Sequence, residues 1–112
     1  KPYANWVGGV FRAVVTAGGR PVPHAEVEIE YLNHEPQIDA RRFDPQGQVS
    51  APQDSFVTLS IRADASGQVV IGLPRAGWWG ICALDLVEGA THAGKPLSVD
   101  AVLWIKATDM TK

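Results

Sequence analysis

The chain has 112 residues, 46% of them hydrophobic, and a formal net charge of −2, which suits one globular domain with a buried core. Its ten lysines and arginines are scattered, so it has neither the basic stripe nor the alternation of aromatic and basic residues that nucleic-acid binding requires. No apolar run approaches the roughly 18–20 residues that cross a bilayer, and Cys82 is the only cysteine, which excludes an internal disulfide and a thiolate metal cluster.

Alternation of apolar residues with other residues predicts two strands in the first third of the chain, at residues 10–16 and 26–31. A turn rich in Gly and Pro separates them at residues 17–23. The second strand has one apolar face. Its opposite face carries Glu26, Glu28 and Glu30. We expect this strand to be half-buried, with its acidic face toward water or attracting cations at low salt.

The pattern dissolves after the acidic strand and returns near the middle of the chain. Residues 33–54 are polar and interrupted by prolines, which predicts a long loop with a short strand around Arg42–Phe43. Alternation then predicts a strand at residues 56–62, a hairpin turn at 64–67 and a returning strand at 68–73.

The last third of the chain predicts two more strands, at residues 78–87 and 99–107, with a loop at 89–96 between them. No segment shows a helical period of useful length. About seven short strands separated by turns predict an all-β fold, an antiparallel β-sandwich of the immunoglobulin-like or prealbumin-like kind. We expect residues 1–112 to form this single domain.

Two adjacent tryptophans lie between glycines at Gly77-Trp78-Trp79-Gly80. Neighbouring side chains of a strand point to opposite faces, so one ring should fill the core and the other should lie outside. The parity of Trp78 matches the apolar residues Cys82, Leu84 and Leu86. We therefore expect Trp78 and a buried Cys82 thiol in the core, and Trp79 on the surface as a contact for a partner.

Several motifs carry a resemblance to known families. Gly19-Arg20-Pro21 to Glu28 and the turn Asp64-Ala65-Ser66-Gly67 resemble prealbumin-like and carboxypeptidase-regulatory-like domains. The segments Arg75–Gly80 and Ala101–Lys106 narrow the resemblance. Together they look like the C-terminal domain of a bacterial periplasmic family of unknown function, some members of which are accessory periplasmic components of energy-coupling-factor nickel transporters.

This resemblance implies a non-enzymatic periplasmic binding or accessory module linked to nickel uptake, with a membrane metal transporter component as partner. It also implies that the chain, which begins at Lys1 without a signal peptide, is the C-terminal part of a longer precursor. The alternative is a protein- or carbohydrate-interaction sandwich that uses an exposed tryptophan and the 33–54 loop. Catalysis is not expected, because no serine lies in a nucleophile elbow and no carboxylate pair is evident.

Nickel, or another divalent transition metal, would use imidazole nitrogens together with oxygen donors. His34, Glu35 and Asp39 lie in a segment that can wrap an ion, so they form the predicted metal site. His24 lies at the other end of the acidic strand, and a strand of eight residues spans roughly 25 Å, so the two histidines cannot share one ion. The alternative is that the histidines are only solvated loop residues.

Overall fold

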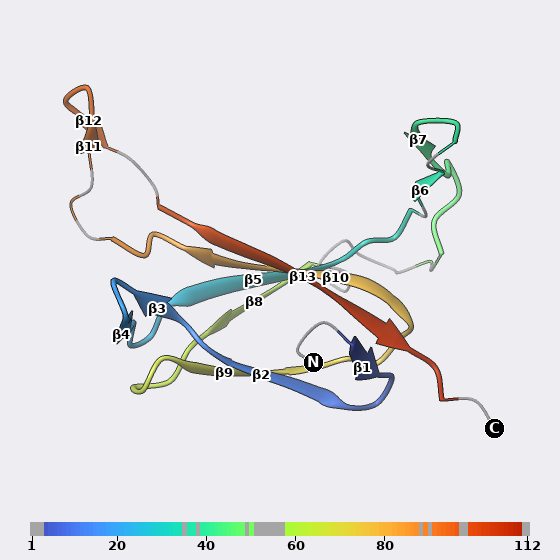
Figure 1. Cartoon of the computed structure of the whole chain (residues 1–112), viewed down its shortest axis with the longest axis horizontal. Helices are drawn as coiled ribbons and strands as arrows, with labels where there is room; N and C mark the ends of the chain where they lie inside the picture. The colour runs from blue at the N-terminus through green and yellow to red at the C-terminus, as the bar shows by residue number, and fades with distance from the viewer. Residues whose placement is uncertain are drawn as a thin grey trace.

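The computed structural model describes residues 4–34, 36–37, 39–48, 50, 58–87, 89, 91–96 and 99–110. Every regular element in these residues is a β-strand, which confirms the all-β prediction (Figure 1). The strands are β1 (Ala4–Trp6), β2 (Val10–Val14), β3 (Thr16–Ala17), β4 (Arg20–Pro21), β5 (Glu26–Tyr31), β6 (Pro36–Gln37), β7 (Arg42–Phe43), β8 (Thr58–Arg62), β9 (Gln68–Gly72), β10 (Gly77–Leu84), β11 (Thr91–His92), β12 (Lys95–Pro96) and β13 (Ala101–Thr108).

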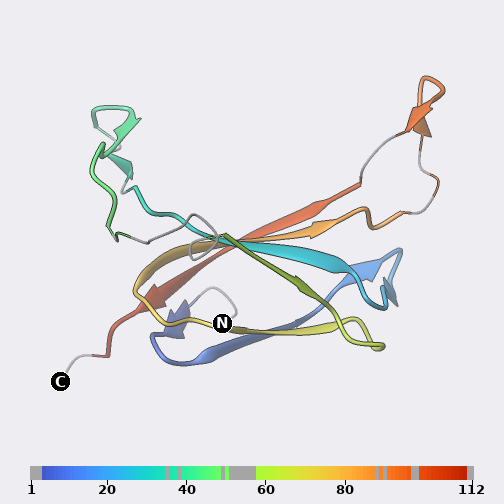
Figure 2. The ribbon, with the colours of Figure 1, turned by 180° about the vertical axis from the view of Figure 1, so that it is seen from behind.

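Two layers of sheet build the domain. The larger layer has the order β1-β13-β10-β5-β8, in which β1 runs parallel to β13 and all other neighbours are antiparallel. The smaller layer consists of β2 paired with β9, and β3 and β4 form a hairpin after β2. Figures 1 and 2 show β2 and β9 lying across one face of the larger sheet. This arrangement of packed antiparallel sheets is consistent with the predicted β-sandwich.

The core lies between the two layers. On β5 the burial alternates as predicted, because Val27, Ile29 and Tyr31 are buried and Glu28 and Glu30 are exposed. The larger sheet also buries residues of β10 and β13 against side chains of the smaller layer. The buried residues of that smaller layer are Phe11, Val69, Ile71 and Leu73. Full burial of an aliphatic side chain contributes about 1.5–3 kcal/mol, so this interface is the main source of stability.

The turn after β8 differs from its prediction. Asp64 and Gly67 close the turn, and the Asp64 carboxylate accepts the backbone N–H groups of Ser66 (2.8 Å) and Gln68 (2.9 Å). However, β8 pairs with β5 and β9 pairs with β2, so the chain crosses from one layer to the other. The predicted hairpin is therefore wrong in its pairing, because the same turn chemistry serves a crossing between layers as well as a hairpin.

The two predicted loops contain short hairpins. The pair β6–β7 lies within the 33–54 loop and confirms the short strand predicted at Arg42–Phe43. The pair β11–β12 lies within the 89–96 loop. Both hairpins project away from the two layers, beyond opposite ends of the larger sheet (Figure 1).

Candidate functional site

The structure reverses the predicted orientation of the two adjacent tryptophans. Trp79 is buried, with 6% of its surface exposed, whereas Trp78 is only partly buried on the opposite, outer face of β10. Trp79 lies opposite Tyr31 on β5 and Ile105 on β13, which are both core residues. The expectations of Trp78 in the core and Trp79 as a surface contact are therefore wrong. Both faces of β10 are apolar, so the alternation of its side chains does not show which face is buried. The register of β10 with β5 determines that the face carrying Trp79 lies in the core.

Trp79 and Tyr31 form an aromatic pair at one end of the core, and the polar atom of each ring donates a hydrogen bond to a backbone carbonyl. Their ring centroids are 4.8 Å apart and their planes are inclined by 54°. The indole Nε1 donates to the Arg75 carbonyl (3.0 Å), and the Tyr31 hydroxyl donates to the Ala76 carbonyl (2.7 Å). Both rings therefore bury their apolar atoms and still satisfy their polar ones, as buried Trp and Tyr usually do.

Gly77 makes room for this pair. Its φ of +133° is a conformation that side chains rarely adopt, and a Cβ there would lie 2.8 Å from the Tyr31 ring. Residues 75–79 thus have a structural role, in which two carbonyls cap the rings and a glycine admits the tyrosine.

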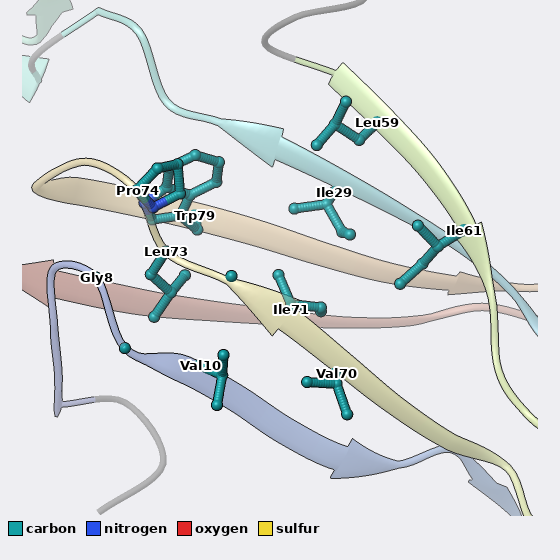
Figure 3. Close-up of a pocket in the computed structure, with 12 residues that line it drawn as sticks. Gly8, Val10, Ile29, Leu59, Ile61, Val70, Ile71, Leu73, Pro74 and Trp79 are labelled. Atoms are coloured by element: carbon teal, nitrogen blue, oxygen red, sulfur yellow. The ribbon is translucent and has the colours of Figure 1, made fainter.

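An apolar groove of about 500 Å³ opens beside this aromatic pair, between β8 and β9. Figure 3 shows Ile29, Ile61 and Ile71 along it, Trp79 and Leu73 at one end, and Leu59 and Val70 near its two rims. Leu59 and Val70 are 45% and 51% exposed. The groove exists because the two strands of the smaller layer cannot cover all five strands of the larger sheet.

Both strands that flank the groove have an edge with no partner strand among the described residues. β8 is the last strand in the order of the larger sheet, and β9 pairs only with β2. Backbone N–H and C=O groups on such edges can pair with an added strand. The groove thus combines an apolar floor with main-chain groups along its rims, which is the chemistry that binds an extended peptide. The sequence did not predict this groove, although the consecutive apolar residues Val69, Val70 and Ile71, which make both faces of the strand apolar, were a signal for it.

Cys82 also differs from its prediction, since the thiol lies on the outer face of β10 and is partly exposed. Burial, then the charge of Asp100, then that of Glu28, raise the pKa of this thiol above its ordinary value of 9.0. Each influence disfavours the thiolate, so the site opposes nucleophilic chemistry at sulfur.

The predicted metal residues lie only partly within the described chain. His34 and Asp39 are exposed, and Glu35 lies outside the described residues. His34 Nδ1 lies 2.8 Å from the Asp44 carbonyl, to which it donates as the protonated nitrogen, so that Nε2 is left for another ligand. His24 lies at the opposite end of β5 from His34, as predicted. Among the described residues, no three His, Cys, Asp or Glu side chains gather into a metal-binding group.

Comparisons with known proteins identify a family without a known activity. No curated protein and no solved structure matches the chain. The described residues contain no helix that could cross a membrane. A family model described as a domain of unknown function, DUF4198, matches residues 1–85. The match covers β1 to β10 and includes the double tryptophan, so this chain belongs to the DUF4198 family.

Proposed function

We propose that this chain is a non-catalytic binding module that seats an extended, apolar segment of a partner protein in the groove between β8 and β9. The observation that carries the proposal is the pairing of an apolar floor with two strand edges that have no partner in the described chain. An extended segment would place alternate apolar side chains on the floor and its N–H and C=O groups against a rim.

The size of the groove sets the expected affinity. A floor built from residues of four strands receives two or three apolar side chains of the segment, each contributing about 1.5–3 kcal/mol when fully buried. Ordering a flexible segment opposes much of this gain. We therefore expect weak binding, with a dissociation constant of about 0.1–1 mM, which corresponds to about −4 to −5.5 kcal/mol.

A labelled peptide with alternating valine and threonine tests the proposal by fluorescence anisotropy. Leu59→Arg and Val70→Arg each place a charge at a partly exposed groove position, so they should weaken binding without unfolding the domain. Val102→Arg, at a 63% exposed position on the outer face, is the matched control and should bind as the wild type does. A peptide N-methylated at alternate residues should bind weakly, because it cannot donate to a strand edge. Equal binding by all variants, or by both peptides, contradicts the proposal.

The family resemblance suggests where such a module acts. Following it, we propose that the natural partner belongs to a periplasmic nickel-uptake system, in which this chain serves as an accessory part. Co-purification with the membrane component of such a system, lost in Leu59→Arg but kept in Val87→Arg, would support this assignment. Val87 is the control here because it is 46% exposed and does not line the groove. If Leu59→Arg still co-purifies with the membrane component, the chain binds that component through a surface other than the groove.

One observation favours a second candidate function, weak nickel binding at the 33–54 loop. The hydrogen bond from His34 Nδ1 to the Asp44 carbonyl orients the ring and leaves Nε2 as the nitrogen for a metal, as hydrogen bonds to the other ring nitrogen do in metal sites. His34 also lines a shallow pocket together with Glu30, which could supply an oxygen donor. A single imidazole with carboxylates is a sparse set for nickel, so we expect affinity weaker than micromolar.

A calorimetric nickel titration tests this second candidate. His34→Ala should abolish the binding heat, whereas His24→Asn should keep it. Asparagine is the matched control at position 24, because His24 has a φ of +57° that asparagine tolerates. Unchanged binding by His34→Ala would move the site elsewhere, and submicromolar binding by the wild type would contradict the expected weakness.

A further inference from the structure

The outer face of the larger sheet, opposite the core, carries an apolar stripe on β10 and β13. The strand register places Trp104 beside Gly80 and Val102 beside Cys82 on this face. The stripe consists of Trp78, Cys82, Leu84, Val102 and Trp104. Val102 and Trp104 are 63% and 46% exposed. Most sheets that leave one face to water place polar residues there, so this stripe is an unusual feature of the outer face.

Gly80 holds the most prominent ring of the stripe in place. A Cβ at position 80 would lie 2.9 Å from the Trp104 ring, so the indole of β13 lies directly over the glycine of β10. Gly80 itself is buried by this contact. The Trp104 ring thus packs against β10 at Gly80 while nearly half of the residue remains exposed, which gives a partner an aromatic surface held against the sheet.

The acidic row (Glu26, Glu28 and Glu30) runs along one side of the stripe. Register places Glu30 opposite Gly80, Glu28 opposite Cys82 and Glu26 opposite Leu84. Glu28 influences the ionisation of the Cys82 thiol, which agrees with its position at the border of the stripe.

Within the described strands β5, β8, β10 and β13, the cations lie near the ends of this surface. Lys106 Nζ lies 5.6 Å from the centre of the Trp78 ring, and Arg62 is opposite Glu26 on β8. Glu28 and Glu30 face the uncharged Ser60 and Thr58 on β8. Both glutamates are exposed, so the middle of the row presents two negative charges beside the apolar stripe.

We infer that the outer face docks an amphipathic helix of a partner protein, one whose apolar stripe is flanked on one side by lysine or arginine. Charge complementarity selects this partner, since two basic residues would meet Glu28 and Glu30 while apolar residues cover Trp104 and Val102. Glu28 and Glu30 are about 7 Å apart along the strand, close to the separation of about 5–6 Å between helical residues four apart. This surface is separate from the groove between β8 and β9.

Two further observations favour a helix over other occupants. Both β10 and β5 already have partner strands on each side, so their main chains offer no edge to an added strand. A partner that covers Gly80 and the acidic row together therefore meets side chains of these two strands, as helices do when they cover a sheet. A membrane surface rich in anionic lipids is disfavoured, because the acidic row would be repelled by it.

The test uses a labelled 16-residue helical peptide with a leucine stripe flanked by lysine, and a copy with glutamate in place of lysine. Anisotropy measures their binding to the wild type, to Glu28→Lys/Glu30→Lys, and to Asp39→Lys/Asp109→Lys. The last variant is the matched control, because it changes the charge equally at exposed positions outside the acidic row. Glu28→Lys/Glu30→Lys should bind the lysine peptide at least about tenfold more weakly than the wild type does, and should prefer the glutamate peptide. The affinity of the control variant for the lysine peptide should change by less than about twofold.

A second pair of variants tests the apolar part of the surface. Trp104→Ala should weaken the binding of the lysine peptide by at least about tenfold. Phe43→Ala, which removes a 57% exposed aromatic ring of β7, should leave this binding unchanged. Circular dichroism melts show whether each variant is folded. If Trp104→Ala does not fold, the comparison of Glu28→Lys/Glu30→Lys with Asp39→Lys/Asp109→Lys still tests the inference. The inference is overturned if the wild type binds neither peptide, if both double variants lose affinity equally, or if phosphatidylserine vesicles bind and the lysine peptide does not.

Discussion

Replacing each of the two adjacent tryptophans by alanine should have very different effects on stability. Burial of a large aromatic side chain removes about 150–250 Å² from water, which at about 25 cal/mol/Å² corresponds to about 4–6 kcal/mol. Trp79 is 6% exposed and also donates a hydrogen bond of 3.0 Å to the Arg75 carbonyl. Replacing it by alanine therefore removes nearly all of this burial free energy. Large-to-small core substitutions of this kind cost about 3–5 kcal/mol, and we expect Trp79→Ala to fall in that range.

Trp78→Ala should cost only about 1–2 kcal/mol, because Trp78 lies partly exposed on the outer face and its polar contact is the Lys106 amine. Urea denaturation followed by far-ultraviolet circular dichroism measures both, since tryptophan fluorescence changes with the substitutions themselves. Domains are stable by only about 5–15 kcal/mol, so Trp79→Ala could abolish folding. Trp79→Phe keeps a ring, loses the hydrogen bond and should cost about 1–2 kcal/mol. Equal losses in Trp78→Ala and Trp79→Ala, or a larger loss in Trp78→Ala, would refute the assigned orientation.

Three more substitutions test local features of the fold. Gly80→Ala should displace the Trp104 ring and cost about 1–3 kcal/mol in the urea assay, and adding Trp104→Ala should cost little more, because the clash is then absent. Alkylation of Cys82 by iodoacetamide at pH 8 should be slow and should speed up in Glu28→Gln, which removes one cause of the raised pKa. The same raised pKa means that the unfolded thiol ionises first, so the free energy of unfolding should fall as the pH rises above 9.0, an effect that Cys82→Ser removes. Asp64→Ala leaves the backbone N–H groups of Ser66 and Gln68 without their carboxylate and should lower stability by about 1–2 kcal/mol, whereas Asp64→Asn should recover part of the loss.

The strand at β5 illustrates what could be predicted without the structure. Glutamates at every second position allow only one face to be buried, because a buried carboxylate without a partner is costly. The phase of burial follows at once, and the structure buries Val27, Ile29 and Tyr31 as expected. The short strand at Arg42–Phe43 was likewise predictable, since prolines on either side, Pro36 and Pro45, limited where pairing could occur.

The candidate metal residues mark the limit of spacing arguments. The sequence correctly separated His24 from His34, because the length of a strand is a constant of its geometry. It could not predict that the Asp44 carbonyl, ten residues away in a polar loop, would orient the His34 ring. Such a contact depends on how the loop folds back, and composition carries no information about that.

What the sequence by itself determined was the all-β class, the position of most strands and the orientation of those with one polar face. The tertiary structure alone decided which face of β10 is buried, because Gly77–Leu84 is apolar on both faces and only its register with β5 distinguishes them. It alone also decided that the turn after β8 crosses between layers, that Trp104 lies over Gly80, and that a groove stays open beside β9. Each of these depends on contacts between strands distant in sequence, and a local pattern of two-residue period cannot encode which strands become neighbours.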